Sequence, residues 1–532
     1  MIDEKALKSL ACVLSNPISH VLVDGSQRLG EFDQARAGSL HQRLASAHAS
    51  AGRGSDAAAE YLRAAELAES IHHASTLRRH AAEEWIRSGN VREGVRLLAS
   101  VGAEFNIRHT DYVPLALLSI VWQRAHLALR RSGYVERPAT EAPAKDLARL
   151  EVYRALTAGL TLWSPIIATR YHLKYLRLAL KLGQPRRLAP ALASEAMFVA
   201  MAGERAYPRA RNLLSQSLAI GTRLQDPRIV GGTHALDAMC GWLTGRWDLA
   251  RDRGKEAERI LRENCVGAWW ELSVARNALL GGLLWGGQWN EYAARLAEFS
   301  EDARTRNDLS SLAMYRMNHG AVSLARDDVG QADRDLLEAQ RILANAWSTR
   351  GFHIPHFFGL FCRGQVAIYA GNRSAAMDLL TRELPAMRTS YLLRVETIAI
   401  LALLLEGMLA VACAAGPAAP GKGSSDLLRR ARRCAEAIRR KPAIWGSGLA
   451  MIIEAGADAA QGRLDSACGC WSDAERELSR AGMLMFAAAA RYWRGHVAGD
   501  RELTASAEDF FLNEGVVSPP RLAMILAPGI FQ

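Results

Sequence analysis

A glycine- and proline-rich stretch near residue 420 has the spacing of a nucleotide site. Gly416–Lys422 (GPAAPGK) matches the GxxxxGK pattern of a phosphate-binding loop. In such loops a Ser or Thr follows the lysine and holds magnesium, but Gly423 stands there and Ser424 comes one place late. The loop must also follow a β-strand, whereas a helical apolar run precedes it and two prolines stiffen it. We interpret the stretch as a linker and expect no cofactor.

Two further groups contain metal-ligand residue types without metal-site geometry. Cys468 and Cys470 fall on one predicted helix, where positions two apart point in different directions, and no second Cys or His pair stands nearby. The pairs in His353–His356 and His72–His73 lack HExxH spacing and an obvious carboxylate. Serine-hydrolase, dinucleotide-binding and kinase motifs are also missing. We therefore predict no metal, no catalytic residues and no enzyme.

A basic helix and two aromatic groups are candidates for binding rather than catalysis. Asp426–Lys441 combines one apolar stripe with a solvated basic face. That face could meet an acidic partner or nucleic acid, although no aromatic residues are interleaved to stack bases. Its candidate contact residues are Arg429, Arg430, Arg432, Arg433, Arg439 and Arg440.

The aromatic groups fall in two separate predicted repeats. They are Trp269, Trp270, Trp285 and Trp289, and then Phe352, Phe357, Phe358 and Phe361. Helix-pair core is the simpler interpretation, but on a concave groove such side chains could anchor a peptide. We take His353 and Phe357 as possible contacts for a partner in such a groove.

The elements that must position these residues are repeated helix pairs. A small residue, usually Gly, ends the first helix, and packing residues follow at offsets of about five, nine and twelve. The copies and their predicted packing positions are Gly52, Ala57, Tyr61, Ala64; Gly89; Gly245, Ala250, Gly254, Ala257; Gly287; Gly371, Ala376; and Gly462, Ala467, Trp471, Ala474. A further copy has Asp327 in the glycine place.

This spacing has a physical cause. Glycine adopts the left-handed cap conformation without steric cost, so it ends the first helix. Offsets of four and three place the later residues on one face of the second helix, where small side chains let two helices approach closely. The anchors recur about every 40 residues, longer than the tetratricopeptide unit of about 34. We predict an all-α, tetratricopeptide-like α-solenoid with roughly 22–26 antiparallel helices.

Breaks in the pattern give the expected domain organisation. Residues 1–38 are unassigned and contain no secretory signal pattern; residues 39–132 hold the first repeats; 133–147 form a linker; 148–414 form the main solenoid; 415–425 form a flexible loop; and 426–532 hold the last repeats and a cap. Within the first repeats, Asp111–Pro114 precede an apolar helix that runs through Trp122.

Composition agrees with a folded protein of this kind. The chain has 532 residues, of which 49% are hydrophobic and 23% charged, so wholesale disorder is excluded. The net charge of +11 raises nonspecific affinity for nucleic acid or anionic lipid without informing the fold. Eight scattered cysteines indicate reduced thiols, and we expect a cytoplasmic protein. Thr397–Ala415 is long enough to span a membrane, but Glu406 and Gly407 at its middle favour a buried helix, and we expect no membrane partner.

Several stretches support a family resemblance. They are 39–68 (SLHQRLASAHASAGRGSDAAAEYLRAAELA), 77–98, 265–289 (CVGAWWELSVARNALLGGLLWGGQW), 351–372 and 519–529. In these the chain resembles the C-terminal tetratricopeptide-like region of large bacterial signalling proteins, over about residues 39–529. Those proteins carry a serine/threonine kinase domain and an AAA-type ATPase domain upstream, and both are absent here. The resemblance implies a sensing or partner-binding platform and transfers no enzymatic residue to this chain.

Together these observations predict a non-catalytic scaffold or regulatory module that binds a protein or peptide in its groove. One alternative is the tail fragment of a split kinase–ATPase regulator that acts with a separately encoded kinase. Another is a nucleic-acid-binding regulator that uses the basic helix, which we consider the weaker interpretation. The sequence leaves the partner, the signal, the role of residues 1–38 and the oligomeric state open.

Overall fold

The computed structural model describes residues 34–129, 134–138, 141–346, 352–415 and 422–530. This part of the chain contains 24 α-helices, two short 3₁₀ turns and no strand. The predicted all-α, tetratricopeptide-like solenoid is therefore confirmed, and the helix number falls inside the predicted range. The first helices are α3 (Gln34–Ser50), α4 (Gly54–Glu66), α5 (Ile71–Arg87), α6 (Val91–Glu104), α7 (Val113–Leu129), α8 (Ala144–Leu160), α9 (Pro165–Leu182), α10 (Pro185–Ala200), α11 (Tyr207–Arg223), α12 (Pro227–Thr244), α13 (Trp247–Asn264) and α14 (Trp269–Gly286).

The remaining helices continue the same pattern of paired packing, in which each helix contacts the next one along the chain. They are α15 (Trp289–Thr305), α16 (Leu309–Ala325), α17 (Val329–Ala346), α18 (Ile354–Ala370), α19 (Arg373–Thr389), α20 (Glu396–Ala414), α21 (Lys422–Arg439), α22 (Ile444–Ala459), α23 (Leu464–Arg480), α24 (Leu484–Ala498), α25 (Arg501–Asn513) and α26 (Pro519–Leu526).

The glycine anchors lie at the turns inside these pairs. Gly52, Gly89, Gly245, Gly287, Gly371 and Gly462 all have φ between +73° and +97°. Asp327, which takes the glycine place in one copy, also has a positive φ of 60°. The left-handed conformation ends one helix and lets the next fold back on it, which is why these positions favour glycine.

The packing positions after the anchors are buried between helices. Each of them has less than one tenth of its surface exposed or lies in the buried class, and Trp471 is among the largest fully buried side chains. The set comprises Ala57, Tyr61, Ala64, Ala250, Gly254, Ala257, Ala376, Ala467, Trp471 and Ala474. A Cβ on Gly254 would lie 2.8 Å from the Cβ of Leu279, so this small residue sets the spacing of α13 and α14.

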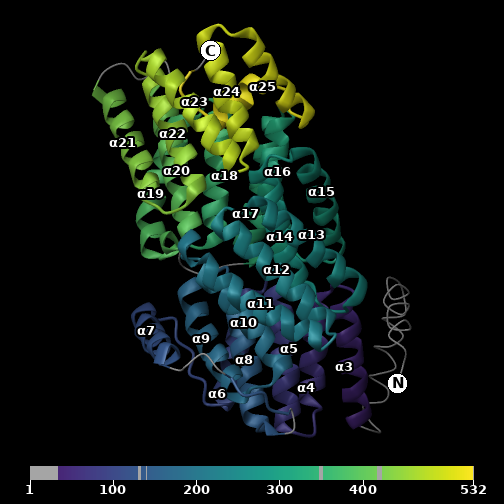
Figure 1. Cartoon of the computed structure of the whole chain (residues 1–532). Coiled ribbons are helices and arrows are strands. Elements are labelled where there is room, and N and C mark those ends of the chain that lie inside the picture. Colours follow the sequence, from purple (N-terminus) through teal and green to yellow (C-terminus); the bar gives the residue numbers. More distant parts are fainter. Residues whose placement is uncertain (1–33, 130–133, 139–140, 347–351, 416–421, 531–532) are drawn as a thin grey trace.

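Helix α7 interrupts the regular order of pairs. Helix α6 packs on α8 rather than on α7, and the main contact of α7 is with α9. In Figure 1, α7 lies at the margin of the molecule, outside the stacked helices. The apolar helix predicted through Trp122 thus exists, but it is an addition to the solenoid rather than one of its layers.

The two predicted linkers are shorter than expected. Helix α8 begins at Ala144 and α21 begins at Lys422, so each predicted linker ends in the first turn of a helix. Within the first linker, Arg137 lies against the end of α9, where its N–H donates to the carbonyl of Gly183 at 3.1 Å. Most of the GxxxxGK stretch, residues 416–421, and nearly all of the unassigned N-terminal segment lie outside the described residues.

The solenoid curves until distant repeats touch. Gly52, in the turn between α3 and α4, lies against Arg306 at the end of α15, and a Cβ on Gly52 would come within 2.3 Å of the Arg306 Cβ. At the other end, Val517 N–H donates to the carbonyl of Ala325 at 2.8 Å, and α26 packs on α18 and α24. The first and last helices therefore both return to the middle of the chain (Figure 1).

Helix α20 is the apolar segment singled out in the sequence. Among the described residues it is the helix that is long and apolar enough to cross a membrane, and 83% of its apolar window is buried inside the protein. Glu406 in its middle is paired with Arg430 of α21 at 2.6 Å. Burial against neighbouring helices on both sides explains its composition without a bilayer.

Candidate functional site

A cavity of about 650 Å³ lies inside the curve of the solenoid. Its walls come from α3 to α5, α8, α10, α12, α14 to α16, α18, α20, α24 and α26, so the first and last helices both help to enclose it. Ligand pockets in proteins generally fall between about 300 and 1,000 Å³. The cavity is the natural candidate site of the described structure because it is large and is assembled from early, middle and late helices.

One end of the cavity is aromatic. The Trp285 ring of α14 lies 6.2 Å from Phe361 of α18 and 5.8 Å from Phe486 of α24, centroid to centroid. Trp242 of α12 faces Phe358 at 6.1 Å. Leu522, Ile525 and Leu526 of α26 complete this end. The structure thus brings Trp285 of the tryptophan group and Phe361 of the phenylalanine group together at this end.

The middle of the cavity is soft and sparsely polar. Met197, Met201 and Met239 line it, and methionine adapts to ligands of varied shape. Asn277 and Asn318 also reach the wall, and their side-chain amides donate to the carbonyls of Ser273 and Met314 at 2.8 Å each. These amides turn back on their own helices, so the middle of the cavity is mostly apolar.

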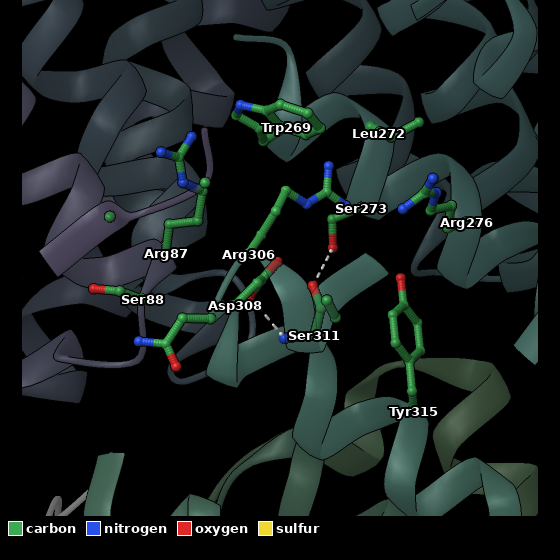
Figure 2. A pocket seen from close by; sticks show the side chains of 14 residues that line it. Arg87, Ser88, Trp269, Leu272, Ser273, Arg276, Arg306, Asp308, Ser311 and Tyr315 are labelled. Atoms are coloured by element: carbon green, nitrogen blue, oxygen red, sulfur yellow. Dashed lines mark hydrogen bonds between the residues drawn. The ribbon is translucent and has the colours of Figure 1, made fainter. Parts of the chain in front are cut away.

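The opposite end is rich in arginine. A small pocket of about 20 Å³ adjoins the cavity, and Arg87, Trp269, Ser273, Asp308 and Ser311 line both. Figure 2 shows this end, with guanidinium groups from α5, α14 and the α15–α16 turn around Trp269, Ser273 and Ser311. The Ser273 and Ser311 hydroxyls lie 3.2 Å apart, and Asp308 caps α16 by accepting from Ser311 N–H at 3.0 Å.

The guanidinium groups of Arg87, Arg276 and Arg306 are held close together despite their like charge. Burial and the neighbouring Arg276 lower the pKa of Arg306 to about 10, and burial also lowers the pKa of Arg87. Carboxylates offset this charge, because Asp302 pairs with both Arg276 and Arg306, and Glu84 pairs with Arg87. The Arg306 guanidinium stacks 4.0 Å above the Trp269 ring, whose buried Nε1 has no hydrogen-bond partner among the described residues. The Trp269 Nε1–H is therefore the buried donor that this end leaves for an anionic or carbonyl oxygen.

The two partner contacts predicted in the phenylalanine repeat have structural roles. Phe357 is fully buried in the core, so the prediction that it contacts a partner is wrong for this structure. His353 lies with its Nδ1 2.5 Å from the carbonyl oxygen of Trp163 and its ring edge-on to that indole. It thus joins the start of α18 to the end of α8, while its neighbours Phe358 and Phe361 line the cavity.

The arginines of α21 mostly face carboxylates. Arg430 pairs with Glu406, Arg432 with Asp458 and Arg439 with Glu454, so three of them join α21 to α20 and α22. Arg429 and Arg440 pair with Asp426 and Glu436 of their own helix. Arg433 is exposed and forms no ion pair with a described residue. The basic run therefore works largely as packing between helices.

The cysteine and histidine groups stay apart. Within the described ranges, no group of three or more His, Cys, Asp or Glu side chains could hold a metal ion. Burial raises the pKa of both Cys468 and Cys470, which keeps these thiols protonated. His73 Nε2 lies 3.1 Å from the Gln42 amide oxygen, and His72 stacks on Phe105.

Sequence reasoning missed most of the cavity wall. Trp163, Trp242, the three methionines and the arginine end carry no motif, because they meet only through the curvature of the solenoid. The signal present in the sequence is the pair of aromatic groups, which predicts possible groove anchors but does not show that both contribute to one site.

Comparisons with known proteins give no family assignment. No family model matches the chain, and no curated protein matches it. Among solved structures, the chain is similar to a crystal structure of a Rap protein complexed with competence and sporulation factor, at 10% identity and a TM-score of 0.44. That similarity covers 77% of this chain and 99% of the other. A likeness at this level is one of helical arrangement and leaves the function of this chain to its own geometry.

Proposed function

We propose that this chain is a non-catalytic binding module that takes a short, mostly apolar peptide into its central cavity. The observation that carries the proposal is the cavity itself, which is enclosed by both ends of the solenoid and runs from an arginine end to an aromatic end. Binding there would tie the first, middle and last helices together. A ligand would thereby change the curvature or rigidity of the whole solenoid, which is a means of regulation.

The two ends of the cavity define the ligand. Aromatic rings and methionines at one end favour large apolar side chains, which gain most from burial. At the other end Arg87, Arg306 and the unpartnered Trp269 Nε1 favour a carboxylate or a backbone carbonyl. A peptide with apolar residues and a free carboxyl end meets both requirements, with its carboxylate against the arginines.

Cavity-filling variants test the site. Short synthetic peptides rich in Leu and Phe, with free or amidated carboxyl ends, would be titrated while tryptophan fluorescence is followed, since six tryptophans line the cavity. Ala158→Phe and Ala321→Phe place a ring in the cavity and should weaken binding about tenfold or more. Ala505→Phe, on the exposed face of α25, is the matched control and should bind normally.

The arginine end is tested by a thermodynamic cycle that combines an arginine substitution in the protein with amidation of the peptide's carboxyl end. Arg306→Gln should weaken binding of the free-acid peptide while affecting the amidated peptide much less, because the lost interaction needs a carboxylate. Equal weakening of both peptides would contradict the assigned orientation. If no peptide binds but a fatty acid such as laurate does, the cavity is a lipid site and the peptide proposal fails.

We also propose where such a module acts. The resemblance to the helical tails of kinase–ATPase signalling proteins supports a cytoplasmic, bacterial scaffold or regulator that works with a separately encoded kinase. A kinase–ATPase reading frame without its own tail beside this gene, and a stable complex of the two purified proteins, are the expected findings. A neighbouring kinase that already carries a complete tail and fails to bind this chain would contradict the split-gene version.

A further inference from the structure

Helix α7 exposes an apolar face that the solenoid does not use. Leu118, Val121 and Leu129 are 69%, 68% and 85% exposed, and Leu115 and Trp122 are 47% and 57% exposed. Monomeric proteins rarely show large side chains of this kind side by side on one helix. Twelve other large apolar residues of the described chain are exposed; Tyr112 directly precedes α7, and the rest lie scattered over other helices and turns.

The face is apolar along its whole length. The exposed residues of α7 are Pro114, Leu115, Leu118, Val121, Trp122, Ala125, His126, Ala128 and Leu129, and none of them is Asp, Glu, Lys or Arg. The buried side of the helix holds Ala116 and Gln123, which face α9. Small and polar residues of this helix face the protein, and large apolar residues face outward. This reversed amphipathic pattern indicates that another molecule covers the outer face.

A row of cations on α9 lies beside this face. Arg170, Lys174 and Arg177 are spaced four and three residues apart, so they share one side of the helix. The Arg177 guanidinium lies over the Trp122 ring of α7 at 5.1 Å, which places the row at the edge of the apolar face. None of the three forms an ion pair with a described carboxylate, although most arginines elsewhere in the described structure do.

Arg170 makes the missing anion most evident. It is only 7% exposed, yet its Nε and Nη1 have no hydrogen-bond partner within the described residues. Leaving a buried cation unpaired is costly, and the usual remedy is a carboxylate or a bound anion. Burial and the charges of Arg170 and Arg177 also lower the pKa of Lys174 to about 8. The row is thus short of negative charge.

From this juxtaposition we infer that α7 and the cation row of α9 form a docking surface for an anionic lipid bilayer. The apolar face of α7 enters the boundary between headgroups and acyl chains, with Trp122 at the level of the headgroups. Lys174 and Arg177 contact lipid phosphates and supply the attraction to an anionic surface. The surface is peripheral, so it differs from a membrane span, and it departs from the sequence-based expectation of no membrane partner.

Other occupants fit less well. A second copy of the chain paired through α7 would bring another unpaired cation row to the same interface, where like charges repel. A protein helix would need to be both apolar and acidic to satisfy this surface. The marginal position of α7, outside the stacked helices in Figure 1, leaves it free to meet an extended flat surface.

Vesicle binding of the full chain tests the inference. Phosphatidylcholine vesicles with and without phosphatidylglycerol would be floated with the protein at low and high salt. We expect binding to the phosphatidylglycerol vesicles and its loss at high salt. Leu118→Glu with Val121→Glu, and separately Lys174→Ala with Arg177→Ala, should each reduce the bound fraction about tenfold or more. Leu512→Glu, at another exposed apolar position on α25, should leave binding unchanged.

Several outcomes would overturn the inference. The inference fails if the wild-type protein does not bind phosphatidylglycerol vesicles. It also fails if the α7 variants and the Leu512→Glu control lose binding equally. A fall in molar mass of the Leu118→Glu, Val121→Glu protein in solution would assign the face to a second copy. Far-ultraviolet circular dichroism and thermal unfolding must match the wild type in each variant, which separates lost docking from lost folding. The cavity plays no part in this test, so it can succeed or fail independently of peptide binding.

Discussion

Helices α9 and α21 are both basic, but they differ in what stands opposite their cations. In α21, carboxylates from α20 and α22 meet Arg430, Arg432 and Arg439. In α9, Lys181 alone among the four cations Arg170, Lys174, Arg177 and Lys181 has such a partner, Asp146 at 3.1 Å. Helix α21 therefore has the denser run of positive charge, but fewer of its cations are left to bind a partner. Charge count along a helix says little about binding until the neighbouring repeats have been placed.

The difference also shows how a solenoid distributes charge. A basic helix inside the stack has two neighbours whose acids can reach it, whereas the outer side of α9 meets only α7, whose facing surface is uncharged apart from Arg124. Arg124 itself turns inward, toward Glu195 of α10. The inserted helix α7 thus shields the row from acidic partners and leaves its charge for something outside the chain.

The largest expected effect on stability comes from removing the carboxylate that faces the buried side of α9, so that the groups it pairs with lose their anion. Glu195 is 1% exposed and accepts from Arg124 and from His172 Nε2, the latter at 2.9 Å. Glu195→Ala leaves both without an anion and should lower the free energy of unfolding by about 3–5 kcal/mol. Urea denaturation measures this, with Glu195→Gln as a milder, isosteric control. A loss below about 1 kcal/mol would mean that unpaired cations are tolerated cheaply here, which would weaken the significance of the outer row.

Removing a carboxylate partner from an arginine of α21 should lower the free energy of unfolding by a smaller amount. Glu406→Gln removes the partner of Arg430 in a half-buried setting, so we expect a loss of about 1–2 kcal/mol in the free energy of unfolding. Arg433→Ala, on the same helix but without an ion pair to a described residue, should change it by less than about 0.5 kcal/mol. Equal effects of the two substitutions would show that the ion pairs of α21 do not distinguish its arginines.

Supplying the missing anion to α9 should stabilise the protein slightly. Lys174→Glu places a carboxylate four residues after Arg170 and three before Arg177, which should add about 0.5–1 kcal/mol to the free energy of unfolding. The same variant should lose vesicle binding. Stabilisation together with retained vesicle binding would separate the cation row from the docking surface.

The smallest effect is a dependence on pH. The folded-state pKa of Lys174 is about 8, below its ordinary 10.5, because of burial and the charges of Arg170 and Arg177. Between these values the unfolded chain binds more protons, so this group makes the protein more stable as pH rises through that window. Relative to Lys174→Met, the wild type should therefore gain stability between pH values near 8 and near 10. A constant difference in urea midpoint across that range would contradict the depressed pKa.

Sequence patterns were sufficient for the repeats but not for the cavity. Anchors such as Gly245 and Gly462, with packing residues at fixed offsets, arise from local helix geometry and so can be read from one sequence. The contact of Gly52 with Arg306 depends on small rotations that accumulate over many repeats, and no local pattern encodes their sum. The same holds for the meeting of Trp285 with Phe486.

The errors have equally physical reasons. The prediction that Phe357 contacts a partner rests on the ability of aromatic residues on a concave face to anchor peptides. Its position on α18 points into the core, while Phe358 and Phe361 reach the cavity. The apolar composition of α7 was visible in the sequence. Its exposure was not, because an apolar helix is normally covered, and only the packing order of α6, α8 and α9 shows that α7 lies outside the layers.

The contact between Gly52 and Arg306 has a consequence for how this protein can evolve. Open solenoids lengthen or shorten by whole repeats, since each unit touches only its neighbours. Here the chain meets itself, so adding or deleting one helix pair between α4 and α15 would move Gly52 away from Arg306 and open the wall that both repeats share. The contact between distant repeats therefore constrains the number of repeats between them. Insertions on the outside of the solenoid, such as α7, leave that contact in place.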